Sequence, residues 1–267
     1  MGVTTLLVAG ERLAVRVVGD GQPAWVGIHG LGSDSRDLLP VADLVDGSAL
    51  LVDLPGFGAS DRPRRAYPVR RAARAVLSVL DHFGVDHAVW LGCSYGGHVA
   101  LRACLDAPER VTGLVLCSSA GLDPHPPAGL AAAYEETLMR LRPSALVAAA
   151  CDALVSQPNA LTHAFRSRRL KAHVALSSSA DYRAIARSAV GSLADDAPRR
   201  LEQVDVPVEL LLGTNDPLIS VAVVRAAHQR LTDSALTVLD RTGHMPWLET
   251  PEAVAARLRR LVSGVTC

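Results

Sequence analysis

The stretch Leu91-Gly92-Cys93-Ser94-Tyr95-Gly96-Gly97 places one serine between two glycines, with an apolar run before it and a helical pattern after it. A serine at a sharp turn from a strand into a helix adopts strained backbone angles and projects its hydroxyl above the sheet edge. The residues two before and two after it must be small so that the turn can close, and Gly92 and Gly96 meet this need. The pattern therefore predicts a strand over residues 86–92, a helix over residues 97–107 and an exposed Ser94 nucleophile.

The composition fits one globular domain with an insertion. The chain has 267 residues, of which 49% are apolar and 20% are charged, and this balance supports a large buried core without a signature of disorder. The formal net charge is zero, so there is no electrostatic case for binding nucleic acid or an anionic membrane surface. We therefore expect a small-molecule substrate as the partner, and the sequence gives no basis for choosing an oligomeric state.

The cysteines do not suggest a disulfide framework or a metal site. They are odd in number and have no short paired spacing: Cys93, Cys104, Cys117, Cys151 and Cys267. No basic segment precedes an apolar run at the N-terminus, and no apolar stretch approaches the ~18 residues that a membrane span needs. We expect a cytoplasmic protein with no metal or organic cofactor.

Apolar runs and helical periodicity alternate along the first 120 residues and again after residue 203. Strands are predicted at residues 3–9, 12–19, 24–29, 49–53, 86–92, 111–117, 206–213 and 235–239, and helices at residues 36–45, 68–83, 97–107, 221–231 and 251–261. The first two strands form an antiparallel hairpin. Strands that alternate with helices imply a doubly wound α/β fold with a mostly parallel, eight-stranded sheet.

The alternation is interrupted after the sixth strand. Residues 121–202 contain no strand-like run, and their alanine-rich segments, punctuated by prolines, predict helices at residues 128–141, 144–156, 159–173 and 182–193. We interpret residues 1–120 and 203–267 as the core domain and residues 121–202 as an all-helical insertion.

Three polar residues each follow a predicted strand, where a doubly wound sheet carries its sites. They are Ser94, Asp216 and His244, in that order along the chain. A serine hydroxyl needs a base with a pKa near 7 to remove its proton, and His244 supplies it. The histidine in turn needs a carboxylate on its other ring nitrogen, which is the role we assign to Asp216.

The tetrahedral intermediate of acyl transfer also needs donors for its oxyanion, and each lost donor costs about 3–4 kcal/mol. The backbone N–H of Tyr95, at the start of the helix after Ser94, is one predicted donor. The second is the N–H of Leu31, in the loop that follows His29-Gly30.

Together these motifs resemble the alpha/beta-hydrolase superfamily, in its branch with a helical cap, over nearly the whole chain. The motifs are His29-Gly30-Leu31-Gly32, Asp53-Leu54-Pro55-Gly56-Phe57-Gly58-Ala59-Ser60, Gly92-Cys93-Ser94-Tyr95-Gly96-Gly97, Gly213-Thr214-Asn215-Asp216 and Gly243-His244. The resemblance implies Ser94 as nucleophile, Asp216 as acid, His244 as base, and the amides of Leu31 and Tyr95 as the oxyanion hole. It also implies that residues 121–202 form the cap that roofs the pocket. Haloalkane dehalogenases and epoxide hydrolases are disfavoured, because they need an aspartate where this chain has Ser94.

Other polar residues have alternative interpretations. Asp123 follows the sixth strand, where some relatives keep the acid of the triad, so it stays an alternative to Asp216. His29 is expected to shape the oxyanion loop rather than to transfer protons. Asp53 is expected to bond the turn at residues 56–58.

Seven apolar residues are candidates for lining the substrate pocket. Four flank the acid and base loops and three lie in the insertion: Leu218, Ile219, Met245, Trp247, Tyr134, Met139 and Phe165. A role in core packing is the alternative for each of them.

The residues therefore predict a serine hydrolase of a small to medium, hydrophobic ester or lactone. Cleavage of a carbon–carbon bond, or a thioesterase, cyclase or lyase step, is the alternative on the same residues. It is favoured by Arg166, Arg168 and Arg169, which offer positive charge to an acidic substrate. It is disfavoured because such hydrolases usually carry Gly-Pro-Gly after the first His-Gly, where this chain has Leu31-Gly32-Ser33-Asp34. A non-hydrolytic ligand receptor or pseudoenzyme is the alternative from a different class.

Overall fold

The computed structural model describes residues 2–8, 10–62, 67–125, 144–175, 188 and 191–265. One eight-stranded sheet runs through the molecule in the order β1-β2-β4-β3-β5-β6-β7-β8. Only the pairings β1·β2 and β2·β4 are antiparallel. The strands are β1 (Gly2–Val8), β2 (Glu11–Val18), β3 (Pro23–Ile28), β4 (Ser48–Val52), β5 (Ala88–Cys93), β6 (Val111–Cys117), β7 (Val208–Gly213) and β8 (Ser234–Leu239). The predicted α/β fold with a mostly parallel sheet is confirmed.

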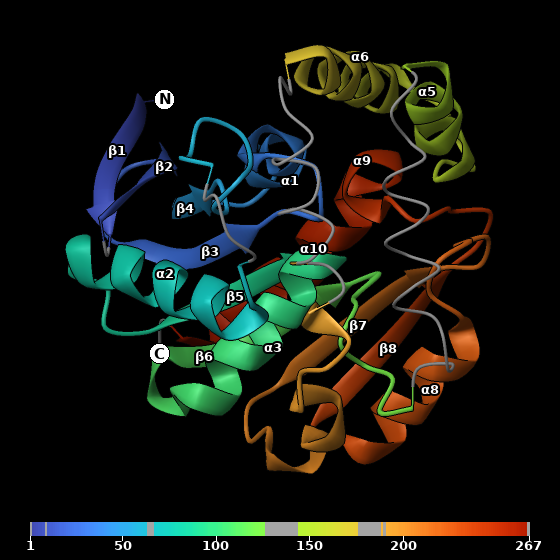
Figure 1. Cartoon of the computed structure of the whole chain (residues 1–267). Coiled ribbons are helices and arrows are strands. Elements are labelled where there is room, and N and C mark those ends of the chain that lie inside the picture. The colour runs from blue at the N-terminus through green and yellow to red at the C-terminus, as the bar shows by residue number, and fades with distance from the viewer. Residues whose placement is uncertain are drawn as a thin grey trace.

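Helices cover both faces of this sheet (Figure 1). The α-helices are α1 (Leu39–Ala42), α2 (Val69–His82), α3 (Tyr95–Asp106), α5 (Ser144–Ala153), α6 (Ala160–Ala175), α8 (Val221–Arg230), α9 (Pro246–Glu249) and α10 (Pro251–Val265). Short 3-10 turns are η1 (Ser35–Leu38), η2 (Pro108–Arg110), η3 (Ala197–Arg199) and η4 (Leu201–Gln203). Helices α2, α3 and α8 pack on one face, and α1, α9 and α10 pack on the other, so the core has two apolar layers with the sheet between them.

The central strand β5 shows why the sequence forms these layers. Its side chains alternate, with Trp90 in the layer under α2 and α3 and with Val89 and Leu91 in the layer under α10. All three residues are completely buried. A strand covered on both faces reads as a continuous apolar run, and each such side chain contributes about 1.5–3 kcal/mol when it is fully buried. The carboxyl end of β5 is thereby fixed in the centre of the molecule.

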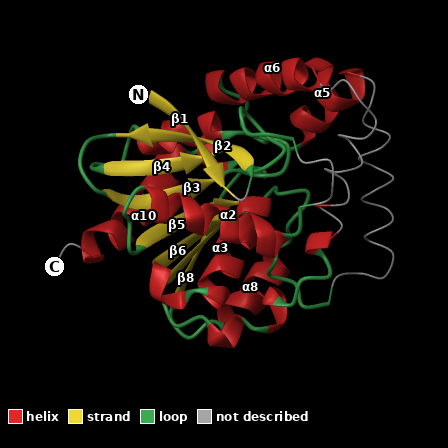
Figure 2. Cartoon of the chain, turned by 60° about the vertical axis from the view of Figure 1, so that its left-hand side comes forward, coloured by secondary structure: helices red, strands yellow, loops and turns green. Residues whose placement is uncertain are grey.

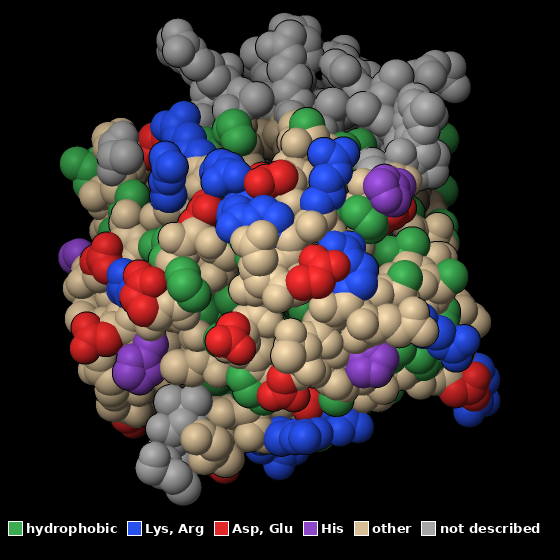
Figure 3. Space-filling model, turned by 90° about the horizontal axis from the view of Figure 1, so that it is seen from below, with side chains coloured by type: hydrophobic (Ala, Val, Ile, Leu, Met, Phe, Trp, Pro, Cys, Tyr) green, Lys and Arg blue, Asp and Glu red, His purple; other side chains and the backbone are tan. Residues whose placement is uncertain are grey.

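Figure 2 shows the twisted sheet from the side, with β1 near the top of the view and β8 near the bottom. The surface seen in Figure 3 carries Lys and Arg interspersed with Asp and Glu, and its hydrophobic side chains are scattered. Among the helices of the described ranges, none is both long enough and apolar enough to span a bilayer.

The segment between β6 and β7 contains α5 and α6, which lie apart from the sheet and above α9 in Figure 1. Helix α5 falls within the predicted helix at residues 144–156, and α6 matches the one predicted at residues 159–173 but continues to Ala175. The predicted helix at residues 128–141 and most of the one at residues 182–193 lie outside the described residues.

The predicted helix over residues 36–45 is wrong in its form. The structure has the 3-10 turn η1, followed by the single-turn helix α1 with Pro40 in its first turn. In a continuous helix, Pro40 would lack the N–H that bonds the carbonyl of Arg36, and its ring would clash with that carbonyl. At the start of a helix the missing N–H costs nothing, so the chain begins a new helix there.

Candidate active site

Ser94 occupies a sharp turn between β5 and α3, with φ 52° and ψ −118°. Such angles cost a non-glycine residue about 1–3 kcal/mol and persist only where the surroundings impose them. Two hydrogen bonds do so, from the Ser94 amide to the carbonyl of Cys117 (3.0 Å) and from the Ala120 amide to the carbonyl of Ser94 (3.0 Å). The neighbouring strand end thereby holds the strained serine in place.

The glycines around Ser94 are required by close backbone approach. A Cβ on Gly92 would lie 2.5 Å from the Cα of Gly97, and a Cβ on Gly96 would lie 2.3 Å from the carbonyl oxygen of Ile28. Both obstacles are backbone atoms, which cannot move aside as a flexible side chain can. The small residues that the sequence indicated at these two positions are therefore needed for the turn to close.

Ser94, His244 and Asp216 form one chain of hydrogen bonds, although they follow three different strands. The Nε2 of His244 lies 3.0 Å from the Oγ of Ser94, and its Nδ1 lies 2.9 Å from the Oδ2 of Asp216. A carboxylate only accepts hydrogen bonds, so Nδ1 carries the proton and Nε2 is left to accept the proton of the serine. The His244 side chain is 5% exposed and that of Asp216 has no exposed surface. The structure thus brings together the three residues predicted for catalysis.

Asp216 is held as a charged acceptor. Its Oδ1 accepts hydrogen bonds from the amides of Leu218 (2.9 Å) and Ile219 (3.0 Å) as well as from His244. Burial by itself would raise the pKa of Asp216, but the hydrogen bond and charge interaction with His244, together with the two amides, outweigh burial and lower the pKa. The carboxylate therefore stays ionised and is suited to stabilising a protonated His244.

The two predicted oxyanion donors belong to segments that adjoin Ser94. Tyr95 is the first residue of α3, so its amide has no acceptor within the helix. Leu31 lies in a turn closed by the hydrogen bond from the Ser33 amide to the Gly30 carbonyl (3.2 Å). This turn packs directly against the serine, because a Cβ on Gly30 would lie 3.8 Å from the Oγ of Ser94.

The neighbouring polar residues hold the oxyanion loop in shape. The Nε2 of His29 accepts from the Leu54 amide (3.0 Å), and its Nδ1 donates to the carbonyl of Gly30 (2.7 Å). Asp53 accepts from the amides of Ser35 (2.7 Å) and Ala59 (2.8 Å). His29 thus holds the loop after β3, as expected. Asp53 bonds Ala59, directly after the turn at residues 56–58 where its role was expected, and it also bonds the loop after β3 through Ser35.

Asp123 is not placed as the acid of the triad. Its Oδ1 accepts a hydrogen bond from the amide of His125 (2.8 Å), two residues further along the chain. His244 is bonded to Asp216 instead, so the geometry favours Asp216 over the alternative.

The predicted pocket residues have different surroundings. Met245 and Trp247 are each 2% exposed and belong to the apolar layer that also contains Phe165 of α6. Trp247 meets the His244 ring edge-on, with ring centres 6.0 Å apart. The Leu218 side chain is 56% exposed, and Ile219 packs against the other apolar layer, so these two residues act at the site through their amides. Tyr134 and Met139 lie outside the described residues.

The segment that connects α5 and α6, residues 154–159, touches the His244 loop directly; we call it the connecting turn. The amide of His244 donates to the carbonyl of Leu154 (2.8 Å). A Cβ on Gly243 would lie 2.5 Å from the same carbonyl oxygen, so a glycine is needed where the turn and the loop meet. The side chain of Asn215, next to Asp216, donates to the Oγ of Ser156 (2.8 Å).

Glu249 joins the connecting turn to the loop that carries His244, and it is not among the residues predicted from the sequence. Its carboxylate accepts from the amides of Ser156 and Gln157 (both 2.8 Å) on one side and of Gly243 (3.1 Å) on the other, with a longer contact from Met245 (3.3 Å). Glu249 is 8% exposed. The available signal was a single carboxylate that ends the otherwise apolar stretch at residues 245–248.

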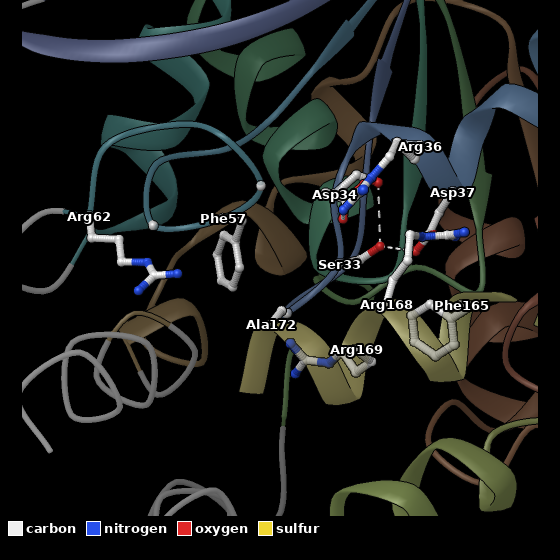
Figure 4. A pocket seen from close by; sticks show the side chains of 13 residues that line it. Ser33, Asp34, Arg36, Asp37, Phe57, Arg62, Phe165, Arg168, Arg169 and Ala172 are labelled. Carbon is white, nitrogen blue, oxygen red and sulfur yellow. Dashed lines mark hydrogen bonds and ion pairs between the residues drawn. The ribbon is translucent and has the colours of Figure 1, made fainter. Parts of the chain in front are cut away.

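A pocket opens beside the oxyanion loop (Figure 4). The loops after β3 and β4 form one side, and α6 forms the other. Within the described residues, no group of three or more His, Cys, Asp and Glu side chains is arranged to hold a metal ion.

Comparison with known proteins gives matches over most of the chain. Residues 25–257 match the model of the alpha/beta hydrolase family. A pimeloyl-[acyl-carrier protein] methyl ester esterase of Neisseria meningitidis is 31% identical, over 89% of this chain and 93% of that protein. The solved structure of an esterase from Exiguobacterium antarcticum shares the fold, with a TM-score of 0.84 at 21% identity over 98% of this chain and 100% of that one. The structure of Est816, an N-acyl homoserine lactone degrading enzyme, has a TM-score of 0.74 at 25% identity over 96% of this chain and 99% of that one.

Proposed function

Since the chain belongs to the alpha/beta hydrolase family and is an enzyme, we propose that it hydrolyses a carboxylic ester or lactone through an acyl-enzyme on Ser94. The observation that carries the proposal is the continuous chain of hydrogen bonds Ser94–His244–Asp216. The methyl ester esterase and the lactone-degrading enzyme among its relatives support the same type of reaction. The substrate we propose is small to medium in size and largely hydrophobic.

The proposed reaction follows from the positions of these groups. The Oγ of Ser94 attacks the carbonyl carbon of the substrate while its proton passes to the Nε2 of His244. The negative charge on the carbonyl oxygen is met by the amides of Leu31 and Tyr95. When the intermediate collapses, the carbon–oxygen bond to the alcohol breaks and the alcohol leaves with the proton from His244. Water then attacks the acyl-enzyme with His244 as base, which releases the acid and restores Ser94.

We also propose that residues 121–202 form a cap over this site. Support comes from α5 and α6, whose connecting turn bonds the His244 loop, and from the Asn159 side chain, which donates to the carbonyl of Leu248 (2.8 Å). Apolar residues of both helices pack in one layer with Met245 and Trp247. This arrangement would provide a largely apolar wall close to Ser94.

Labelling with a fluorophosphonate probe tests the proposed function. The wild-type protein should be labelled and should hydrolyse short p-nitrophenyl esters, because the probe and the substrate both need an activated serine. Ser94→Ala should abolish both signals, whereas Ser78→Ala, on α2 away from the site, should preserve them. Absence of Ser94-dependent labelling would contradict the hydrolase proposal and favour a ligand receptor instead.

A further inference from the structure

A buried carboxylate lies between the loop after β3 and helix α6. It belongs to Asp37 in the turn η1, and its side chain is 2% exposed. The hydroxyl of Ser33 donates to it from the loop, and the guanidinium of Arg168 forms an ion pair with it from α6. Figure 4 shows both groups directed towards Asp37. This carboxylate therefore joins a loop of the core to a helix of the segment between β6 and β7.

Arg168 keeps this carboxylate as an acceptor. Burial raises the pKa of Asp37, and the hydrogen bonds from Ser33 and Arg168, together with the charge of Arg168, limit the rise. Without Arg168 the carboxyl group would take up a proton, because a buried charge without a partner is costly. A protonated carboxyl group turns one of its oxygens from an acceptor into a donor. The hydrogen bond of Ser33 to Asp37 therefore depends on Arg168.

Ser33 closes the turn that carries the predicted oxyanion donor. Its amide donates to the carbonyl of Gly30 (3.2 Å), and Leu31 lies between the two residues. Gly30 packs on the nucleophile, since a Cβ there would lie 3.2 Å from the Cβ of Ser94. Hydrogen bonds weaken steeply when the donor is misaligned, so a small shift of Ser33 changes how well the Leu31 amide can bond an oxyanion.

Helix α6 touches the same loop at a second point. A Cβ on Gly32 would overlap the guanidinium of Arg169, so the Arg169 side chain occupies the space that this glycine leaves open. Gly32 also has a φ of 75°, which favours glycine. Helix α6 thus packs directly on residue 32 and holds residue 33 through the pair of Asp37 and Arg168.

We propose that Asp37 and Arg168 are positioning residues for the oxyanion hole, through which α6 aligns the amide of Leu31. The inference rests on the proposed hydrolysis at Ser94. Asp37 and Arg168 act through Ser33 and take no part in the proton transfers. Because an oxyanion donor stabilises the transition state more than the bound substrate, misalignment of Leu31 lowers kcat and leaves KM nearly unchanged.

Arg168→Gln, assayed with a short p-nitrophenyl ester, tests the proposal. Loss of a whole oxyanion donor costs about 10²–10³ in kcat, so displacement of one should lower kcat about tenfold to a hundredfold. KM should change by less than about threefold. Arg168→Lys should recover most of the kcat, because a single Nη of Arg168 bonds Asp37 and an ammonium group can replace it. Wild-type kcat in Arg168→Gln would overturn the proposal.

A transition-state analogue separates positioning from a role in stability alone. An alkyl trifluoromethyl ketone adds reversibly to an active serine: its carbonyl carbon bonds the Oγ of Ser94, the serine proton passes to His244, and the carbonyl oxygen becomes an oxyanion. The inhibition constant in Arg168→Gln should rise by about the factor by which kcat falls. A lowered Tm with an unchanged inhibition constant would show that the ion pair only stabilises the fold, which would overturn the proposal.

Asp152→Asn is the matched control. Asp152 of α5 pairs with Arg166 of α6 (2.8 Å), and neither residue lines the pocket beside the loop after β3. This change removes an ion pair of the same helix without touching that loop, so kcat and the inhibition constant should keep their wild-type values. An equal loss in Asp152→Asn and Arg168→Gln would overturn the proposal.

A double variant tests whether Ser33 and Arg168 act on the same carboxylate. Ser33→Ala should also lower kcat, and Ser33→Ala with Arg168→Gln should lower it by less than the product of the two separate factors, because both changes release the same contact. Factors that multiply would overturn the proposal. Absence of Ser94 labelling in the wild-type protein would overturn the proposed function, and the present proposal with it, whereas wild-type labelling with unaffected variants would overturn the present proposal alone.

Discussion

Ser94 and His244 meet at one hydrogen bond, but the protein holds them in different ways. Ser94 is fixed by backbone atoms of the sheet and of α3, which approach so closely that only glycine fits at positions 92 and 96. The His244 loop is fixed by a side chain, the carboxylate of Glu249, and by the connecting turn between α5 and α6. The nucleophile therefore belongs to the core, whereas the position of the base depends on the segment between β6 and β7.

The two arrangements respond to different changes. The backbone contacts around Ser94 can be lost only if the sheet is distorted. The turn at Ser94 should therefore tolerate substitutions outside the core. The carboxylate of Glu249 is buried, and it is satisfied only while both the connecting turn and the His244 loop present their amides. A buried polar group that loses its partners costs about 1–3 kcal/mol, and more if it is charged. Movement of the connecting turn should therefore disturb the base before it disturbs the nucleophile.

The largest effect is expected from Gly96→Ala, which disrupts the close backbone packing beside Ser94. The added Cβ would meet the carbonyl oxygens of Ile28 and His29 at 2.3 and 2.5 Å, and neither can move without shifting β3. We expect a loss of about 3 kcal/mol or more in the free energy of unfolding, measured by urea denaturation, and loss of fluorophosphonate labelling. Gly264→Ala is the control, since a Cβ there meets nothing within 4 Å. Wild-type stability in Gly96→Ala would contradict the close packing described for the turn at Ser94.

The next largest effect is expected at the hydrogen bond between His244 and Asp216, which orients the base towards Ser94. Asp216→Asn should lower kcat about 10⁴-fold, by analogy with the same change in serine proteases, because an amide no longer fixes the His244 tautomer that accepts the serine proton. Asp123→Asn is the matched control and should have little effect on kcat. The reverse result would move the role of the acid to Asp123.

The lowered pKa of Asp216 also gives the sign of a pH effect. A carboxylate whose pKa is lower in the folded protein contributes stability that is present above its unfolded pKa of about 3.9 and is lost as the pH falls through the folded value. The difference in unfolding free energy between the wild-type protein and Asp216→Asn should therefore shrink as the pH falls into the acid range.

The sequence predicts the turn at Ser94 well but the loop that carries His244 only in part, because the first depends on local contacts and the second on long-range ones. The features around Ser94 are local, because the strand, the glycines and the helix lie within residues 86–107 and their spacing reports the turn directly. Glu249 acts through amides at residues 156 and 157, more than 90 positions away, and a backbone amide has no signature in the sequence. The same limit applies to Arg169, whose contact with Gly32 depends on how α6 lies over the loop after β3. The helix predicted at residues 36–45 is a different case, because Pro40 is a local signal that divides it although the helical periodicity continues.

The smallest of these effects, from Glu249→Gln, bears most directly on the difference between the two regions. Glutamine has nearly the same size, but its NH₂ group would face backbone N–H donors in place of a carboxylate oxygen, so at least one amide on either the connecting turn or the His244 loop loses its acceptor. We expect a loss of about 1–3 kcal/mol in unfolding free energy and a decrease in kcat larger than any change in KM. Glu252→Gln, at an exposed position on α10, is the control for removal of a charge. If Glu249→Gln lost stability but kept the wild-type kcat, the carboxylate would only hold the fold together. A fall in kcat with intact binding would instead show that the segment between β6 and β7 positions the base through Glu249.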